Sequence, residues 1–235
     1  MPQTASVLSG MAEIHNTNTD ETRAVPRDFA VLNADAILRA PLATEPYHFV
    51  FASDAINPAS RHALLADAPL ISSNGSKALS ELSFGPAFRA LIDDLESPRY
   101  REIVESKFNI DLRERNITIS VRGRLNRHLD GYVHTDLSDK VVSVLLYLNS
   151  DWTDAAGALR ILRSRNIDDY ALQIPPLFGN MLIFQRSDRS WHGHLPYEGP
   201  RMSVQLNWVK SVRRTRQYWR NRFNFLKAIT ILRIF

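Results

Sequence analysis

The sequence contains no cysteine. Without thiols, the chain can form neither disulfides nor thiolate-bound metal sites, which excludes zinc fingers of the cysteine type and iron–sulfur clusters. A metal centre in this protein must therefore use histidine and carboxylate ligands. The lack of cysteine also fits a reducing compartment, so we expect a cytoplasmic protein.

Long apolar runs are missing as well. No stretch reaches the length needed to cross a bilayer, and no basic segment followed by an apolar run marks a secretory signal. The chain has 235 residues, of which 44% are hydrophobic, and it shows no internal repeat. This length and composition predict one sizeable globular domain, which we place over residues 26–209.

Acidic residues are absent from the C-terminal segment. Between Val209 and Phe235 there are eight basic residues and no acidic ones, so the net charge of +4 becomes −4 when this segment is set aside. On a helix, its apolar residues would form one stripe, made by Phe225, Leu226, Ile229 and Leu232. We therefore predict a basic amphipathic helix over residues 210–235. We expect it to dock on the domain or a second subunit, or to hold the protein at an anionic membrane surface, with nucleic acid the least favoured partner.

The rest of the chain divides into a polar arm, a helical part and a β part. Residues 1–25 are polar and lack periodicity, which predicts a flexible N-terminal arm. Helical spacing is clearest at four apolar positions, Phe88, Leu91, Ile92 and Leu95. One early strand is predicted over residues 47–52, and β patterning becomes continuous from Asn116. Helices followed by a run of short strands predict an α+β fold, in which N-terminal helices support an antiparallel jelly roll.

The tripeptide His134-Thr135-Asp136 is the strongest candidate for metal binding. In an extended strand, residues two apart point to the same face, so His134 and Asp136 can converge on one ion while Thr135 faces away. A third ligand from a distant strand would complete two histidines and one carboxylate, the facial triad of non-haem Fe(II) oxygenases. Taken alone, the motif is a weak signal, because a solvated loop also produces it.

The motif is the first of several segments whose order and spacing match those of a known family. The segments lie at residues 130–136, 144–149, 157–161, 179–184, 190–193 and 200–203. The series resembles the 2-oxoglutarate/Fe(II) dioxygenase superfamily over residues 116–209, and most of all its prolyl-hydroxylase-like branch. One departure is Ala158, where the family pattern has the second of two glycines. The resemblance implies a double-stranded β-helix core, the jelly roll also found in cupins.

The resemblance also implies a ligand set. Fe(II) would be bound by His134, Asp136 and a distal histidine, for which His192 and His194 compete. In the prolyl-hydroxylase-like pattern the distal histidine precedes an arginine by nine residues, which selects His192. His194 would then be a neighbour of the site, a substrate-facing residue or a surface histidine. Halogenating relatives replace the carboxylate with a small residue, so the presence of Asp136 favours hydroxylation.

Arg201 is the candidate anchor for the cosubstrate. A planar guanidinium can hold the far carboxylate of 2-oxoglutarate with two parallel hydrogen bonds, and the resemblance adds Tyr147 and Ser203 as hydroxyl donors. A surface salt bridge for Arg201 and a core position for Tyr147 are the alternatives. Around Arg201 polar and apolar residues alternate along a predicted strand, which favours a polar pocket on one face and helix packing on the other. A solvated outer face would give the same alternation.

These residues together predict an Fe(II)- and 2-oxoglutarate-dependent dioxygenase. By resemblance, it would use O2 to hydroxylate an unactivated C–H bond of a small-molecule or peptidyl substrate, and convert 2-oxoglutarate to succinate and CO2. A cupin-type metalloenzyme without 2-oxoglutarate is one alternative, although it would need no anchor such as Arg201. A non-catalytic jelly-roll binding module is another, although it would usually have lost metal ligands. A nucleic-acid demethylase is a narrower alternative, and the main evidence for it is the basic C-terminal segment.

Overall fold

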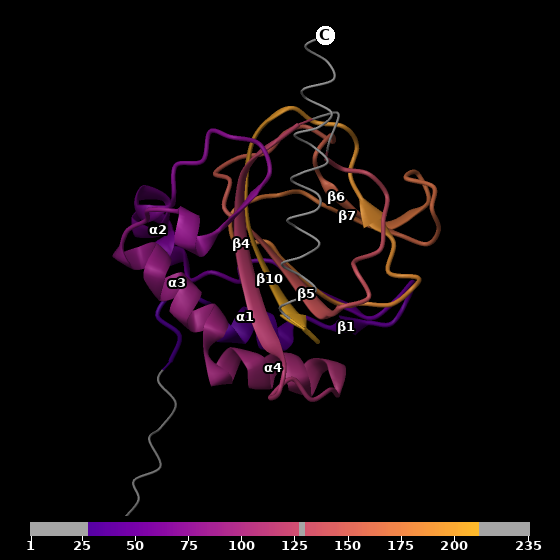
Figure 1. The fold of residues 1–235 in the computed structure, drawn as a ribbon, viewed down its shortest axis with the longest axis horizontal. Helices are drawn as coiled ribbons and strands as arrows, with labels where there is room; N and C mark the ends of the chain where they lie inside the picture. Colours follow the sequence, from indigo (N-terminus) through magenta and orange to yellow (C-terminus); the bar gives the residue numbers. More distant parts are fainter. Residues whose placement is uncertain (1–27, 127–129, 212–235) are drawn as a thin grey trace, which may run out of the picture.

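Two antiparallel sheets form the centre of the computed structural model, which describes residues 28–126 and 130–211 (Figure 1). The larger sheet is built from β1 (Leu42–Ala43), β2 (Phe49–Ala52), β3 (Ser76–Ala78), β4 (Asn116–Leu125), β5 (Lys140–Tyr147), β8 (Met181–Gln185) and β10 (Gly199–Val209), in the order β1-β2-β8-β5-β10-β4-β3. The smaller sheet has the order β7-β6-β9, with β6 (Leu159–Leu162), β7 (Tyr170–Ile174) and β9 (His192–Gly193). Neighbouring strands are antiparallel in both sheets.

The helices lie together on one side of the larger sheet (Figure 1). They are α1 (Ala34–Arg39), the 3-10 helix η1 (Pro58–Ser60), α2 (Arg61–Asp67), the 3-10 helix η2 (Leu79–Glu81), α3 (Pro86–Glu96) and α4 (Pro98–Phe108). Proline begins both α3 and α4, where its missing N–H costs no hydrogen bond. Ser97 ends α3 and caps α4, because its hydroxyl accepts a hydrogen bond from the backbone N–H of Tyr100.

The two faces of the larger sheet carry different cores. Its outer face packs against the helices, and the apolar residues that the sequence predicts on α3 are all buried there. On β10 this face carries Val204, Leu206 and Trp208, and the Trp208 ring stacks on Tyr100 of α4 at 5.9 Å. Its inner face meets the smaller sheet in a second cluster that includes Tyr147, Leu159, Ile161, Leu182 and Phe184. The molecule is therefore layered as helices, larger sheet and smaller sheet, which confirms the predicted α+β jelly-roll-like core with N-terminal helices.

The sequence predicts some elements only in part. The early strand appears as β2, but β1 and β3 are not anticipated, because strands of two and three residues are too short to show alternation. They add the two edges of the larger sheet through backbone pairing. The predicted N-terminal arm and nearly all of the predicted C-terminal helix lie outside the described residues. Within the described part of the chain, no helix is long and apolar enough to span a membrane.

Candidate active site

The three predicted metal ligands come together between the two sheets. His134 and Asp136 lie in the segment between β4 and β5, whereas His192 comes from β9. Their candidate ligand atoms all lie within 4.8 Å of one another. His134 and His192 form an isolated antiparallel bridge, in which each backbone N–H donates to the other carbonyl at 3.0 Å. The extended strand that the sequence predicts here is thus limited to one bridge, because its partner β9 has only two residues.

Two glycines allow these segments to approach closely. Gly131 has a φ of +92°, and a Cβ there would lie 2.6 Å from the His194 ring. A Cβ on Gly193 would lie 2.9 Å from the carbonyl oxygen of Gly131. Larger residues at these positions would force the ligand segments apart, so glycine is needed for the contact between them.

Backbone carbonyls set the protonation of both ligand histidines. The Nδ1 atom of His134 lies 2.7 Å from the carbonyl oxygen of Tyr132, and that of His192 lies 2.9 Å from the carbonyl oxygen of Ser190. A carbonyl can only accept, so each Nδ1 carries a hydrogen and Nε2 is the ring nitrogen that is available to a metal. This is the arrangement by which proteins orient histidines as metal ligands. Both rings therefore offer Nε2 to one ion.

Burial keeps His192 neutral. It lowers the pKa of His192 to about 4, with a further contribution from the charge of His134. A neutral imidazole is the form that can bind a metal. At neutral pH, no proton therefore has to leave this side chain before binding.

The Asp136 carboxylate receives a hydrogen bond on each oxygen. Lys140 donates to Oδ1 at 2.7 Å and Ser143 donates to Oδ2 at 2.5 Å. Burial by itself would raise the pKa of Asp136, but the charge of Lys140, together with these hydrogen bonds, holds it below its usual range. The backbone carbonyl of Asp136 also accepts a hydrogen bond from Arg186 at 3.1 Å. The carboxylate is therefore ionised and fixed in direction.

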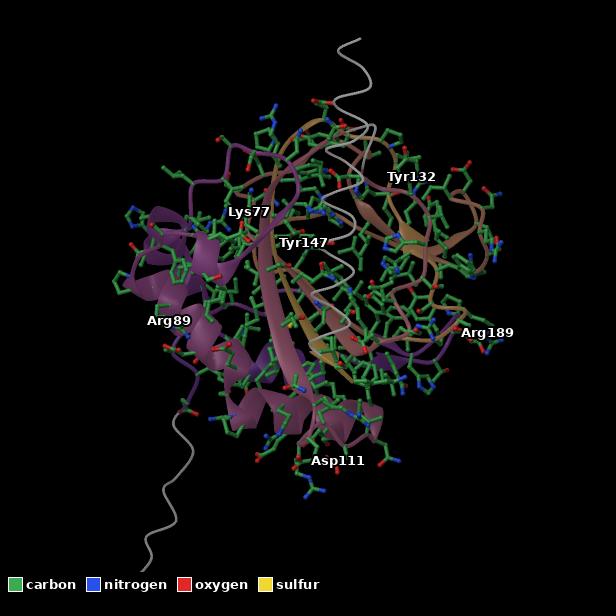
Figure 2. The ribbon with its side chains drawn as sticks, viewed as in Figure 1. Lys77, Arg89, Asp111, Tyr132, Tyr147 and Arg189 are labelled. Carbon is green, nitrogen blue, oxygen red and sulfur yellow. The ribbon has the colours of Figure 1, made fainter. Side chains whose placement is uncertain are left out.

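The predicted cosubstrate residues form a second group in the same cavity, which has a volume of about 330 Å³. Arg201 is buried, and its Nε donates to the carbonyl oxygen of Gly157 at 2.8 Å. One of its terminal nitrogens donates to the Tyr147 hydroxyl at 3.3 Å. Ser203 lies directly opposite Tyr147 in the pairing of β10 with β5. Figure 2 shows Tyr147 in the interior of the molecule, whereas Tyr132, also at this cavity, is 66% exposed.

His194 has a different place from His192. It lines the same cavity and is buried, but it does not belong to the cluster of ligand atoms. Its Nδ1 donates to the carbonyl oxygen of Leu195 at 2.8 Å. Burial and the charge of Arg201 lower its pKa to about 4. The structure therefore brings His192 to the ligand cluster and leaves His194 as a neutral neighbour of the guanidinium.

Several side-chain contacts of the site are not predicted from the sequence. Lys140 and Ser143 are not anticipated as partners of Asp136. A lone serine in an apolar strand does indicate that its hydroxyl has a buried hydrogen-bond partner, but it does not say which one. Asp130 forms an ion pair with Arg122, and Arg122 also contacts the Ser76 hydroxyl from β3. These three residues line the same cavity. Their grouping depends on the unpredicted edge strand β3, so local patterning does not reveal it.

The comparison with family models matches the β part of the chain. The model described as the 2OG-Fe(II) oxygenase superfamily matches residues 116–209, the range from β4 to β10 that contains all three ligand candidates. No curated protein sequence matches the chain.

Solved structures similar to this chain include several prolyl hydroxylases. A prolyl-4-hydroxylase from Pseudomonas putida is 17% identical, and the match covers 69% of this chain and 92% of that chain with a TM-score of 0.49. A prolyl 4-hydroxylase from Phytophthora capsici is 18% identical, with coverage of 70% and 59% and a TM-score of 0.48. The viral collagen prolyl hydroxylase of Paramecium Bursaria Chlorella virus-1 is 16% identical, with coverage of 69% and 96% and a TM-score of 0.48.

Proposed function

Because the chain belongs to the 2OG-Fe(II) oxygenase superfamily through its residues 116–209, we propose that it is an Fe(II)- and 2-oxoglutarate-dependent dioxygenase that hydroxylates an unactivated C–H bond. One observation carries this proposal. The ligand cluster of His134, Asp136 and His192 and the buried Arg201–Tyr147 pair open onto a single cavity. A cavity with a metal-binding end and a carboxylate-binding end suits a keto acid that must reach both.

The donor set fits Fe(II). Two imidazole Nε2 atoms and one ionised carboxylate form the facial triad typical of non-haem iron oxygenases. Fe(II) held by these three residues would keep coordination positions for a cosubstrate and O2. With Fe(II) and 2-oxoglutarate bound, the site would supply the activation of O2 for C–H oxidation, with succinate and CO2 as coproducts.

The protein's own residues would orient the cosubstrate and exclude water. Arg201 would hold the far carboxylate of 2-oxoglutarate, and Tyr147 and Ser203 would donate hydroxyl hydrogens to it. The guanidinium is itself oriented by the Gly157 carbonyl, so little freedom is lost when the carboxylate binds. Arg201 and Tyr147 are buried, and a charge-assisted hydrogen bond is stronger away from bulk water.

The substrate is proposed only as a class. A small molecule or a peptidyl side chain would enter beside His134, which is exposed at this cavity. Arg122, Asp130 and Ser76 give this part of the cavity a polar wall. Such a wall favours a substrate with hydrogen-bonding groups next to the C–H bond that is oxidised.

An anaerobic titration tests this function. Fe(II) and 2-oxoglutarate are added to the metal-free protein, and the visible charge-transfer band between the metal and the keto acid is followed. We expect a band in the wild type, no band with Asp136→Ala, and much weaker 2-oxoglutarate binding with Arg201→Ala. Arg39→Ala, which removes an exposed arginine of α1, is the matched control and should behave as the wild type.

The same titration separates the alternatives. Metal binding without any band in the wild type would refute the proposal and favour a cupin-type metalloenzyme. An unchanged 2-oxoglutarate affinity in Arg201→Ala would favour the same alternative. A band without turnover of 2-oxoglutarate in the presence of O2 would instead indicate a binding module.

A further inference from the structure

A row of polar side chains crosses the larger sheet and ends at Asp136. Thr118 on β4 lies directly opposite Asn207 on β10, and Asn207 lies directly opposite Ser143 on β5. Ser143 and Asn207 are both buried. Ser143 in turn contacts the Asp136 carboxylate. Three neighbouring strands thus connect an interior polar row to one candidate metal ligand.

Ser143 can serve only one acceptor. Its hydroxyl oxygen lies 2.5 Å from Oδ2 of Asp136 and 3.1 Å from the nearer terminal atom of the Asn207 amide, placed there as the oxygen. A serine hydroxyl has a single hydrogen. The carboxylate is ionised beside Lys140, so it has no hydrogen to offer and must receive the one from Ser143. With the amide oxygen facing Ser143, two oxygens would then meet at 3.1 Å without a hydrogen between them.

Turning the Asn207 amide removes this conflict. The oxygen and nitrogen of an amide are distinguished by their hydrogen-bond partners, so either orientation fits the same side-chain position. In the turned orientation the NH2 group donates to Ser143 and to the terminal oxygen of a likewise turned Gln205, which is 3.2 Å away. The Asn207 oxygen then faces the Thr118 hydroxyl at 3.4 Å, which donates to it. The polar hydrogens of Thr118, Asn207 and Ser143 then each have an acceptor within 3.4 Å.

We propose that Asn207 is a positioning residue for the metal site: its NH2 group donates to Ser143 and thereby commits the Ser143 hydrogen to Oδ2 of Asp136. Lys140 holds the other oxygen, so the carboxylate is kept in one rotamer before a metal binds. This inference rests on the proposed function, since it treats Asp136 as a metal ligand. Outer partners of metal ligands typically contribute roughly 10–100-fold to metal affinity.

Two substitutions test the two ends of this hydrogen-bond chain. Ser143→Ala removes the hydrogen donor to Asp136, and we expect the Kd for Mn(II) alone to rise roughly 10–100-fold. Asn207→Asp keeps the shape of the side chain but replaces the donor to Ser143 with an acceptor, so we expect weaker Mn(II) binding here too. A charge effect alone would do the opposite, because an added negative charge attracts the cation. The direction of the change therefore distinguishes positioning from simple electrostatics.

Controls and a rescue complete the design. Ser143→Thr retains a hydroxyl and should keep Mn(II) affinity within a few-fold of wild type. Ser164→Ala and Asn166→Asp make the same chemical changes between β6 and β7, away from the residues that line the cavity, and should have no effect. Thermal unfolding of each metal-free variant shows whether it is folded. The charge-transfer band of the Fe(II)–2-oxoglutarate complex should shift in Ser143→Ala and Asn207→Asp and remain in place in Ser143→Thr.

The possible failures are distinguishable. A wild-type band together with unchanged Mn(II) affinity in folded Ser143→Ala would overturn the positioning role and leave the proposed function intact. Tighter Mn(II) binding by Asn207→Asp would overturn the assignment of Asn207 as the donor. Absence of any band or metal binding in the wild type would overturn both the proposed function and this inference.

Discussion

At the scale of single residues, the site is defined by hydrogen bonds that leave one ring nitrogen free on each candidate ligand histidine. Carbonyl acceptors occupy Nδ1 of both His134 and His192, which leaves each Nε2 for a metal. Asp136 is different, since both its oxygens are held by donors from β5. Sequence reasoning predicts the three candidate ligands but not this arrangement, because a carbonyl acceptor carries no residue-type signal.

The buried Lys140–Asp136 pair gives a stability prediction. In the metal-free protein, Asp136→Ala leaves the Lys140 ammonium buried without its partner, and we expect the free energy of unfolding to fall by about 3 kcal/mol. Urea unfolding in the presence of a chelator measures this change. The double variant with Asp136→Ala and Lys140→Met should recover most of the loss, because it removes the unpaired charge. A double variant as unstable as Asp136→Ala alone would contradict this explanation.

At the scale of elements, the site depends on how the segment before β5 meets β9. The smaller sheet provides one ligand and the loop between β4 and β5 provides the other two. Arg201 and Ser203 come from β10, which also packs against the helices through its opposite face. The predicted alternation on β10 is confirmed by this division. The sequence alone could not decide it, since a solvated face has the same pattern.

Gly131 is the element-scale position with the clearest test. Gly131→Ala places a methyl group against His194 at a positive φ, so we expect lower stability and weaker Mn(II) binding. Gly75→Ala is the matched control, because Gly75 has a φ of +87° but no atom within 4 Å of an added Cβ. Gly75→Ala should lower the free energy of unfolding only by the backbone strain, about 1–2 kcal/mol, and leave Mn(II) affinity unchanged. Equal losses of metal affinity in both variants would refute a specific role for the close approach.

At the scale of the whole molecule, burial between the sheets makes stability depend on pH. Burial lowers the pKa values of His192 and His194 to about 4, whereas an unfolded histidine has a pKa near 6.5. Between these values the unfolded chain binds more protons than the folded chain, so folding stability falls as pH falls from about 6.5 to 4. The pKa of Asp136 is lowered in the folded protein, so its ionised carboxylate stabilises the fold. This contribution is lost only at lower pH, where the carboxylate becomes protonated.

Chelator-treated protein provides the measurement for this prediction. We expect the free energy of unfolding to fall by up to about 3 kcal/mol per buried histidine over this range. Substitution of His194 by asparagine should remove one of the two contributions and flatten the curve. A pH dependence that is unchanged in His194→Asn would show that this side chain is not buried in its neutral form.

The basic C-terminal segment gives a second prediction at this scale. The chain before Val209 has a net charge of −4, so the segment carries all of the excess positive charge. We propose that it attaches the protein to an anionic membrane surface. Removal of residues 212–235 should abolish cosedimentation with phosphatidylserine vesicles in low salt. Retained binding by the truncated protein would refute the proposal, and preferred binding to nucleic acid by the full chain would replace it.

The sequence by itself determined which residue types can bind a metal here, and it indicated the family. The absence of cysteine restricted metal ligands to histidine and carboxylate, and the order of motifs over residues 116–209 indicated the superfamily. The resemblance to this superfamily, carried by the order and spacing of those motifs, predicted roles for His134, Asp136, His192 and Arg201. An ordered series of motifs of this kind can be recognised without knowledge of the fold.

The tertiary structure decided which residues support these groups. Lys140 and Ser143 become partners of Asp136, and Arg122 becomes a wall of the cavity, only after β3, β5 and β10 have taken their places in the larger sheet. The cluster of ligand atoms contains His192 and not His194, as the spacing to Arg201 predicts. Hydrogen bonds act over about 3 Å, whereas these partners come from separate strands. Strand register therefore controls their geometry, and residue spacing in the sequence does not specify it.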